Sequence, residues 1–260
     1  MKKKPKIGIA FGGGGTRAGA HIGAMEILEQ NNIKADMVAG TSAGAAAAAL
    51  YAWGYDSSFM KDVFLNMELS ELIGPKPSMT GLLVPEGYLK IIREHTGDGN
   101  IEDAFLPLYI IAADLVSKKQ VVFTKGNIAR AVHASSAIPG LIKPVKIGDM
   151  LLTDGGIINN CPADVLREQG ADIVLAINCS CIAPYSPKNH IDVVLRAIDM
   201  TGGCDPEKLD ADWVISPIIE PLGILDRHAM EKSYIMGRQC AEAHIEELKE
   251  LIKKYHGNQS

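Results

Sequence analysis

The chain has 260 residues, enough to bury a sizeable core, and 47% of them are hydrophobic while 22% are charged. The formal net charge of -5 argues against a nucleic-acid-binding protein, which would carry a basic face. Its apolar runs are shorter than the roughly 18 residues of a membrane span, so a transmembrane protein is excluded as well.

The N-terminus, MKKKPKIGIAF, places three lysines before an apolar run, as a secretory signal peptide does. The run from Ile7 to Phe11 is interrupted by Gly8 and ends in glycines, so it is too short for a signal peptide, and we expect a cytoplasmic protein. Five cysteines give no disulfide framework, and Cys179 and Cys181 are too close together for a zinc knuckle. We therefore expect reduced thiols, no metal and no cofactor.

Short runs rich in Val and Ile predict buried strands, and segments with helical patterns lie between them. In chain order, the sequence predicts a strand over 6–11, a helix over 16–31, a strand over 36–40, helices over 43–53, 57–72 and 85–95, strands over 107–114 and 119–123, helices over 128–136 and 162–169, a strand over 171–179, a helix over 190–200, a strand over 212–217 and a long helix over 227–255. This alternation is typical of an α/β fold with a mainly parallel sheet. One domain over residues 1–260 is the economical interpretation, with a core at about 6–180 and a C-terminal strand and long helix within 181–256.

The stretch MELSELIGPKPSMTGLLVPEGY is the least regular part of the chain, because Gly and Pro interrupt its apolar residues. Residues 72–85 could form a lid over a substrate or a plain crossover loop. Leu82, Leu83 and Val84 could make transient peripheral contact with a membrane, or they could belong to the core.

Four consecutive glycines, Gly12 to Gly15, connect the first predicted strand to the first helix. The first N-H groups of a helix attract a negative charge, and glycine lets another atom approach the main chain. Gly13, Gly15 and Ala18 fit a dinucleotide-binding pattern, but the acidic residue expected after the second strand is missing. No Gly-Lys-Ser/Thr follows for a P-loop, and a purely structural turn would not need four glycines. An oxyanion hole is the remaining interpretation.

The second strand ends in GTSAG, Gly40 to Gly44, directly before an alanine-rich helix. A G-x-S-x-G sequence between a strand and a helix is typical of a nucleophile elbow, which would expose the hydroxyl of Ser42. Such a serine needs a base. Asp154 follows the apolar run MLLT and precedes Gly155 and Gly156, so it could supply that base or merely cap a turn.

Four motifs in this order resemble those of the patatin-like phospholipase family. They are Gly13-Gly14-Gly15-Thr16-Arg17, Gly40-Thr41-Ser42-Ala43-Gly44, Ala134-Ser135-Ser136-Ala137-Ile138-Pro139 and Asp154-Gly155-Gly156. The resemblance implies a three-layer α/β/α fold around a mainly parallel sheet. It also implies a catalytic dyad of Ser42 and Asp154 without histidine, an oxyanion hole at Gly13, Gly14 and Gly15, and a basic residue, Arg17, that fixes the loop or meets an anionic head group.

The implied activity is hydrolysis of acyl esters of lipids through an acyl-enzyme, as in a phospholipase A, a lysophospholipase or a carboxylesterase. The substrate would be a lipid or another acyl ester, and we expect the reaction to be independent of calcium. One residue departs from the family, which usually has glycine where this chain has Ala18. The sequence does not indicate an oligomeric state.

Two other functions stay open. A Ser-Asp-His esterase could use His228, which follows Asp154 as the order of such triads requires, although a surface or helix-packing role is the simpler interpretation of His228 and of His21. Alternatively, a non-catalytic binding or regulatory protein could retain the fold.

Overall fold

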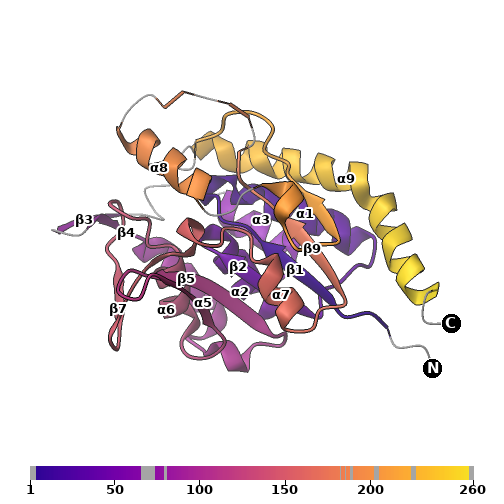
Figure 1. The fold of residues 1–260 in the computed structure, drawn as a ribbon, viewed down its shortest axis with the longest axis horizontal. Coiled ribbons are helices and arrows are strands. Elements are labelled where there is room, and N and C mark those ends of the chain that lie inside the picture. The colour runs from indigo at the N-terminus through magenta and orange to yellow at the C-terminus, as the bar shows by residue number, and fades with distance from the viewer. Residues whose placement is uncertain are drawn as a thin grey trace.

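The computed structural model describes residues 4–65, 74–78, 81–181, 183–184, 186–187, 190–201, 205–223 and 227–257. The strands of the main sheet are β1 (Ile7–Phe11), β2 (Met37–Thr41), β5 (Leu108–Asp114), β6 (Lys119–Phe123), β7 (Val145–Ile147), β8 (Met150–Asp154), β9 (Ile173–Ile177) and β10 (Trp213–Ile215). The helices are α1 (Gly19–Gln30), α2 (Ala43–Ala52), α3 (Ser57–Leu65), α5 (Glu86–Thr96), α6 (Ile128–Ser135), α7 (Ala163–Glu168), α8 (His190–Thr201) and α9 (Arg227–Gly257). Figure 1 shows their arrangement.

The strands are ordered β10-β9-β1-β2-β5-β8-β7, and β6 also pairs with β5. The pairings from β10 to β5 are all parallel, whereas β6 and β8 run antiparallel to β5 and β7 runs antiparallel to β8. The α/β fold with a mainly parallel sheet is therefore confirmed. The antiparallel part follows from connections too short for a crossover helix, such as the four residues between β5 and β6.

The sheet is covered on both faces, because successive side chains of each strand point to opposite sides. Ile7, Ile9 and Phe11 of β1 belong to the large core shared with α1, α2 and α9, while Ala10 packs with α7 on the other face. The alternation of large and small residues in IGIAF thus places bulky side chains under one helical layer and small ones under the other. Three layers result, as the resemblance implied.

The long helix α9 packs along α1, and both chain ends lie on the same side of the molecule in Figure 1. Glycines make this close packing possible. A Cβ atom at Gly23 would collide with the backbone of Tyr234, and one at Gly237 with the backbone of Ala20. The one-domain organisation stays a prediction.

Between α3 and α5, the structure differs from a plain loop. Helix α3 is described as Ser57–Leu65, and residues 66–72 of the predicted helix lie outside the described residues. The irregular stretch contains two short antiparallel strands, β3 (Gly74–Ser78) and β4 (Gly81–Val84). Leu83 packs with the small cluster of Ala137, Leu141, Ile142 and Leu195, so the core interpretation holds for this residue. The side chains of Leu82 and Val84 lie outside the described residues.

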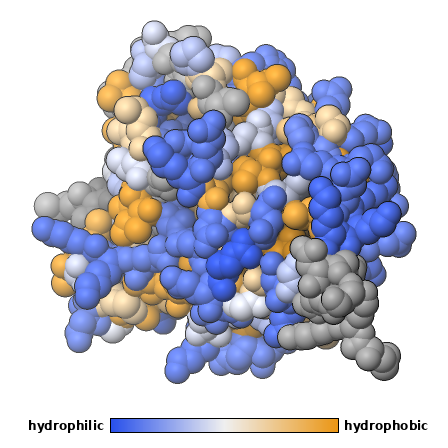
Figure 2. All heavy atoms as spheres, turned by 45° about the vertical axis from the view of Figure 1, so that its right-hand side comes forward, coloured by the Kyte–Doolittle hydropathy of each residue, from blue (hydrophilic) through white to orange (hydrophobic). Residues whose placement is uncertain are grey.

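Hydrophilic residues cover much of the face shown in Figure 2, and hydrophobic residues reach the surface in separate patches. Exposed apolar side chains such as Phe105, Ile219 and Met200 come from different parts of the chain. Scattered exposure of this kind is normal for a folded protein. Among the described residues, no helix combines the length and the apolar character needed to cross a bilayer.

We predict that Gly237→Val destabilises the protein, because its side chain would push α9 away from the backbone of Ala20. Overpacking of this kind typically costs about 1–3 kcal/mol, which urea denaturation can measure. Gln239→Val, at an exposed position two residues further along α9, is the matched control and should change the free energy of unfolding much less. Equal effects of the two substitutions would contradict close packing at Gly237.

Candidate active site

Ser42 occupies a sharp turn between β2, which ends at Thr41, and α2, which begins at Ala43. Its backbone has φ 55° and ψ -124°, an unfavourable conformation for a residue with a side chain. A Cβ atom at Gly40 would collide with the backbone of Gly44, and one at Gly44 with the carbonyl of Phe11. Glycine at both positions therefore lets the strand and the helix approach closely enough to make this turn.

The sheet topology brings Asp154 to the same place. Strand β2 is parallel to β5 and pairs Thr41 with Ile111, whereas β8 is antiparallel to β5 and pairs Asp154 with Ala112. Since β6 occupies the other edge of β5, β2 and β8 share one edge and run toward each other. Their C-terminal ends thus meet beside two consecutive residues of β5.

The hydroxyl of Ser42 donates a hydrogen bond of 2.6 Å to Oδ2 of Asp154. Oδ1 of the same carboxylate accepts a bond of 2.8 Å from the N-H of Gly156. Both side chains are buried, and burial raises the pKa of Asp154 to about 6. Because that value is still below neutral pH, Asp154 is mostly ionised there and can accept a proton from the serine.

Side chains hold the glycine loop at three consecutive carbonyl groups. The carbonyl of Gly12 accepts from Nε2 of His21 at 2.7 Å, that of Gly13 from Nδ2 of Asn160 at 3.2 Å, and that of Gly14 from Nε of Arg17 at 3.3 Å. All three side chains are buried.

The loop N-H groups divide into two pairs. Those of Gly12 and Gly13 donate to the carbonyls of Ile177 and Asn160. Within the described part of the chain, the N-H groups of Gly14 and Gly15 have no protein acceptor. Gly13 thus differs from the expectation that its N-H would belong to an oxyanion hole, because a main-chain carbonyl already occupies that group.

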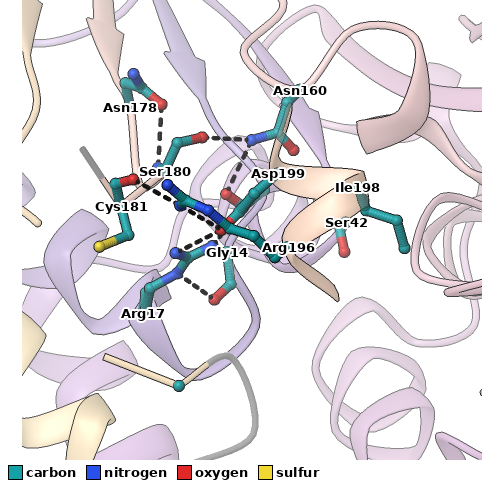
Figure 3. A network of polar contacts seen from close by, with 12 residues as sticks. Gly14, Arg17, Ser42, Asn160, Asn178, Ser180, Cys181, Arg196, Ile198 and Asp199 are labelled. Atoms are coloured by element: carbon teal, nitrogen blue, oxygen red, sulfur yellow. Dashed lines mark hydrogen bonds and ion pairs between the residues drawn. The ribbon is translucent and has the colours of Figure 1, made fainter. Parts of the chain in front are cut away.

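Arg17 is almost completely buried, so it is not a surface arginine of the first helical turn. Its guanidinium makes two hydrogen bonds, of 3.0 and 2.7 Å, to the carboxylate of Asp199 on α8 (Figure 3). Burial alone would lower the pKa of Arg17, but the charge of Asp199 outweighs it and raises the pKa. Arg17 therefore connects the glycine loop to α8.

Two further residues of the site were not identified from the sequence. Oγ of Ser135 accepts the N-H of Ser42 at 2.8 Å and donates to the carbonyl of Ile111 at 2.5 Å, so it fixes the strained turn to β5. Asn160 bonds Gly13 through both its main chain and its side chain. The third motif of the resemblance contains Ser135, but it did not specify this role, and Asn160 lies four residues beyond Gly156.

Ser42 lies where two cavities meet. The larger has about 810 Å³ of empty space, including the part open to solvent, and apolar residues such as Ala46, Met60 and Phe64 line most of it. The smaller has about 320 Å³, and the residues that line it include the three glycines 13–15, Asp154, Asn160 and three residues of α8. Ser42 is among the residues that line each of them.

Neither histidine considered in the sequence contacts the dyad. His21 is buried in α1, where desolvation lowers its pKa to about 4 and keeps it neutral as it donates to Gly12. The helix-packing interpretation of His21 is therefore the one that the structure supports. His228 is exposed on the first turn of α9 and is not among the residues that line either cavity.

Ala18, the departure from the family pattern, has φ -62° and ψ -12°, which any residue adopts. It lines the larger cavity together with Ile22 of α1. Alanine is therefore compatible with the backbone at this position.

A family model described as "Patatin-like phospholipase" matches residues 9–167. An uncharacterised NTE family protein of Mycobacterium tuberculosis is 32% identical over 176 residues, which are 67% of this chain and 49% of that protein. Patatin-like phospholipase domain-containing protein 6 of Homo sapiens is 33% identical over 181 residues, which are 66% of this chain and 13% of that protein. The chain thus spans half or less of the length of these relatives.

Solved structures with similar folds include the type III effector protein ExoU, with a TM-score of 0.54 and 15% identity over 94% of this chain and 53% of that chain. VipD from Legionella pneumophila has a TM-score of 0.51 and 13% identity over 93% of this chain and 67% of that chain. At these identities the likeness shows the fold alone.

We predict that Asp154→Asn stabilises the fold at neutral pH. The pKa of Asp154 is about 6 in the folded protein, and about 3.9 is usual in an unfolded chain, a difference worth roughly 3 kcal/mol. The ionised carboxylate therefore destabilises the fold above pH 6, and this cost disappears as the pH falls toward 4. Urea denaturation should show a larger free energy of unfolding for the variant at pH 7.5, and a smaller gain at pH 4.5.

The control for the loss of a carboxylate is Asp149→Asn, at an exposed position in the turn between β7 and β8. A gain in Asp154→Asn that is independent of pH would rule out the buried charge as its cause.

Proposed function

The chain belongs to the patatin-like phospholipase family, and on this premise we propose that it hydrolyses acyl esters of lipids through a serine nucleophile. The observation that carries the proposal is the hydrogen bond of 2.6 Å between the Ser42 hydroxyl and the buried Asp154 carboxylate. A serine on a strained turn, with a base in contact and an apolar cavity beside it, is the arrangement that acyl transfer requires.

In the first half of the reaction, Asp154 accepts the proton of Ser42 while the serine oxygen attacks the ester carbonyl. The N-H groups of Gly14 and Gly15 stabilise the resulting oxyanion, with the positive end of α2 directed at the same point. Asp154 then donates its proton to the leaving alcohol, and an acyl-enzyme on Ser42 remains.

In the second half, water replaces the alcohol. Asp154 takes a proton from the water, the hydroxide attacks the acyl carbonyl, and the same two N-H groups stabilise the second oxyanion. Return of the proton to Ser42 releases the fatty acid. The pKa of about 6 suits Asp154 to both directions of transfer, because a catalytic base works best when its pKa is close to the working pH.

The larger cavity supports a lipid acyl chain as the substrate group. Its walls include Ala43, Ala46 and Ala47, which lie on one face of α2 within a turn and a half of Ser42. The small side chains of these alanines leave room for the cavity, and Met60 and Phe64 of α3 also line it. An apolar chain that extends from the ester carbonyl would be removed from water along this path.

The smaller cavity is the proposed binding site of the ester group itself, because the glycine loop, Ser42 and Asp154 line it.

A Ser-Asp-His mechanism has less support. The two carboxylate oxygens of Asp154 accept from Ser42 and Gly156, and His228 lies outside both cavities. Contact with a membrane surface would be peripheral and transient in this proposal.

We predict that Ser42→Ala lowers hydrolysis to below about one thousandth of wild type in a panel of phospholipids, lysophospholipids and simple glycerides, since the nucleophile is lost. His228→Ala, the matched control, should leave hydrolysis nearly unchanged. Covalent labelling by a fluorophosphonate probe should occur in wild type and in His228→Ala but not in Ser42→Ala. A folded wild-type protein that the probe does not label would favour a non-catalytic binding protein, and loss of activity in His228→Ala would favour the triad.

We predict that Ala46→Leu selects against long acyl chains, because the leucine would fill the cavity one turn from the nucleophile. Lost apolar space should lower kcat/KM for decanoyl and longer esters by about tenfold or more relative to acetyl and butyryl esters. Ala243→Leu, the same change at an exposed position of α9, is the control. An equal loss of activity on esters of every chain length would contradict this prediction and indicate that the acyl chain binds elsewhere.

A further inference from the structure

The peptide group between Gly13 and Gly14 is held from one side by Asn160. Nδ2 of this residue donates to the carbonyl of Gly13 at 3.2 Å and to Oγ of Ser180 at 3.0 Å (Figure 3). The main-chain carbonyl of Asn160 also accepts the N-H of Gly13 at 2.9 Å. The carbonyl of Gly13 can only accept, so the NH₂ end of the amide is the end that faces it.

This contact determines where the next N-H points. A peptide group is planar, and the described chain contains no cis peptide bond, so the carbonyl of Gly13 and the N-H of Gly14 point in opposite directions. With the carbonyl fixed on Asn160, the N-H of Gly14 has to point away from that amide. Gly14 and Ser42 line the same cavity.

The space around Gly13 is adapted to this contact. A Cβ atom on Gly13 would collide with the side-chain amide of Asn160 and would also come within 3.3 Å of Cβ of Ser42. Glycine is therefore needed at position 13 because the Asn160 amide and Ser42 both pack against it. Its own N-H is not the reason for the glycine.

We propose that Asn160 is a positioning residue that directs the N-H of Gly14 at the oxyanion. It acts through the Gly13 carbonyl and touches no reacting atom. The inference rests on the proposed function for its catalytic consequence, but the contact itself can be tested without any substrate. Arg17 holds the following carbonyl, that of Gly14, in the same way, so the two candidate donors depend on two different side chains.

The test compares Asn160→Ala and the isosteric Asn160→Asp with Asn159→Ala. Asn159 is the neighbouring residue of the same type, and its side chain bonds Gln120 and Asp164 away from the loop. Loss of one oxyanion-hole donor typically costs 100- to 1,000-fold in kcat, and a donor that is only misdirected should cost about 10- to 100-fold. We expect that loss in kcat for both Asn160 variants on a soluble p-nitrophenyl ester, with KM changed less than about threefold.

Labelling of Ser42 by the fluorophosphonate should slow by a similar factor, because the phosphonyl oxygen occupies the same hole. Asn159→Ala should match wild type in both measurements. A merely structural role would instead lower the melting temperature and the active fraction while folded molecules kept their kcat. Folded Asn160 variants with kcat within about threefold of wild type would overturn the proposal.

Hydrogen-deuterium exchange of the peptide that contains residues 12–17 tests the contact directly. The amides of this peptide should exchange faster in the Asn160 variants than in wild type and in Asn159→Ala, because the peptide group loses its anchor. Unchanged exchange would also overturn the proposal. If an Asn160 variant does not fold, Ser180→Ala replaces it, since it removes the second anchor of the same amide and should show a smaller change in the same direction.

A wild-type protein without esterase activity or labelling would refute the proposed function. In that case the exchange measurement would still decide whether Asn160 directs the loop.

Discussion

The carboxylate of Asp154 is buried where β2 and β8 meet, and the cost of burying a charge there constrains everything around it. An ionised carboxylate in the interior needs hydrogen-bond donors, and the hydroxyl of Ser42 and the N-H of Gly156 provide them. Both donors have to be brought in by backbone geometry. Strands β2 and β8 run toward each other along one edge of β5, and this brings the hydroxyl of Ser42 to the carboxylate. The turn after β8 brings the N-H of Gly156 to it.

The same site requires strained or tightly packed backbone, which the surroundings have to stabilise. Ser42 has a positive φ, and Ser135 holds its N-H against β5. The glycine loop has few side chains of its own, so buried His21, Asn160 and Arg17 hold its carbonyls from outside. In the proposed reaction, N-H donors that are fixed in advance would need no reorganisation when charge develops on the oxyanion.

Arg17, one of the three side chains that hold the glycine loop, also connects the site to a distant part of the chain. The ion pair between Arg17 and Asp199 is almost entirely buried, and replacing Asp199 would remove the carboxylate that pairs with the buried Arg17. It joins the glycine loop near the N-terminus to α8, whose residues Leu195 and Ile198 line the smaller cavity. The position of α8 beside Ser42 and Asp154 in this cavity is therefore coupled to the glycine loop.

The sequence by itself determined the features that depend on local backbone. The alternation of strands and helices predicted the α/β fold, the glycines and serine of GTSAG predicted a tight turn, and the four consecutive glycines predicted a loop open to close approach. These features can be predicted from the sequence because each residue type restricts its own φ and ψ and the packing of its immediate neighbours.

Only the tertiary structure decided which groups meet across the chain. Asn160 lies 147 residues from Gly13, and Asp199 lies 182 residues from Arg17, so no spacing indicated either contact. The role of Gly13 changed for the same reason, since its N-H was open in the sequence and is occupied in the fold. A backbone group bonds whichever partner packing brings within about 3 Å, and that partner is known only when the strands and helices have been placed together.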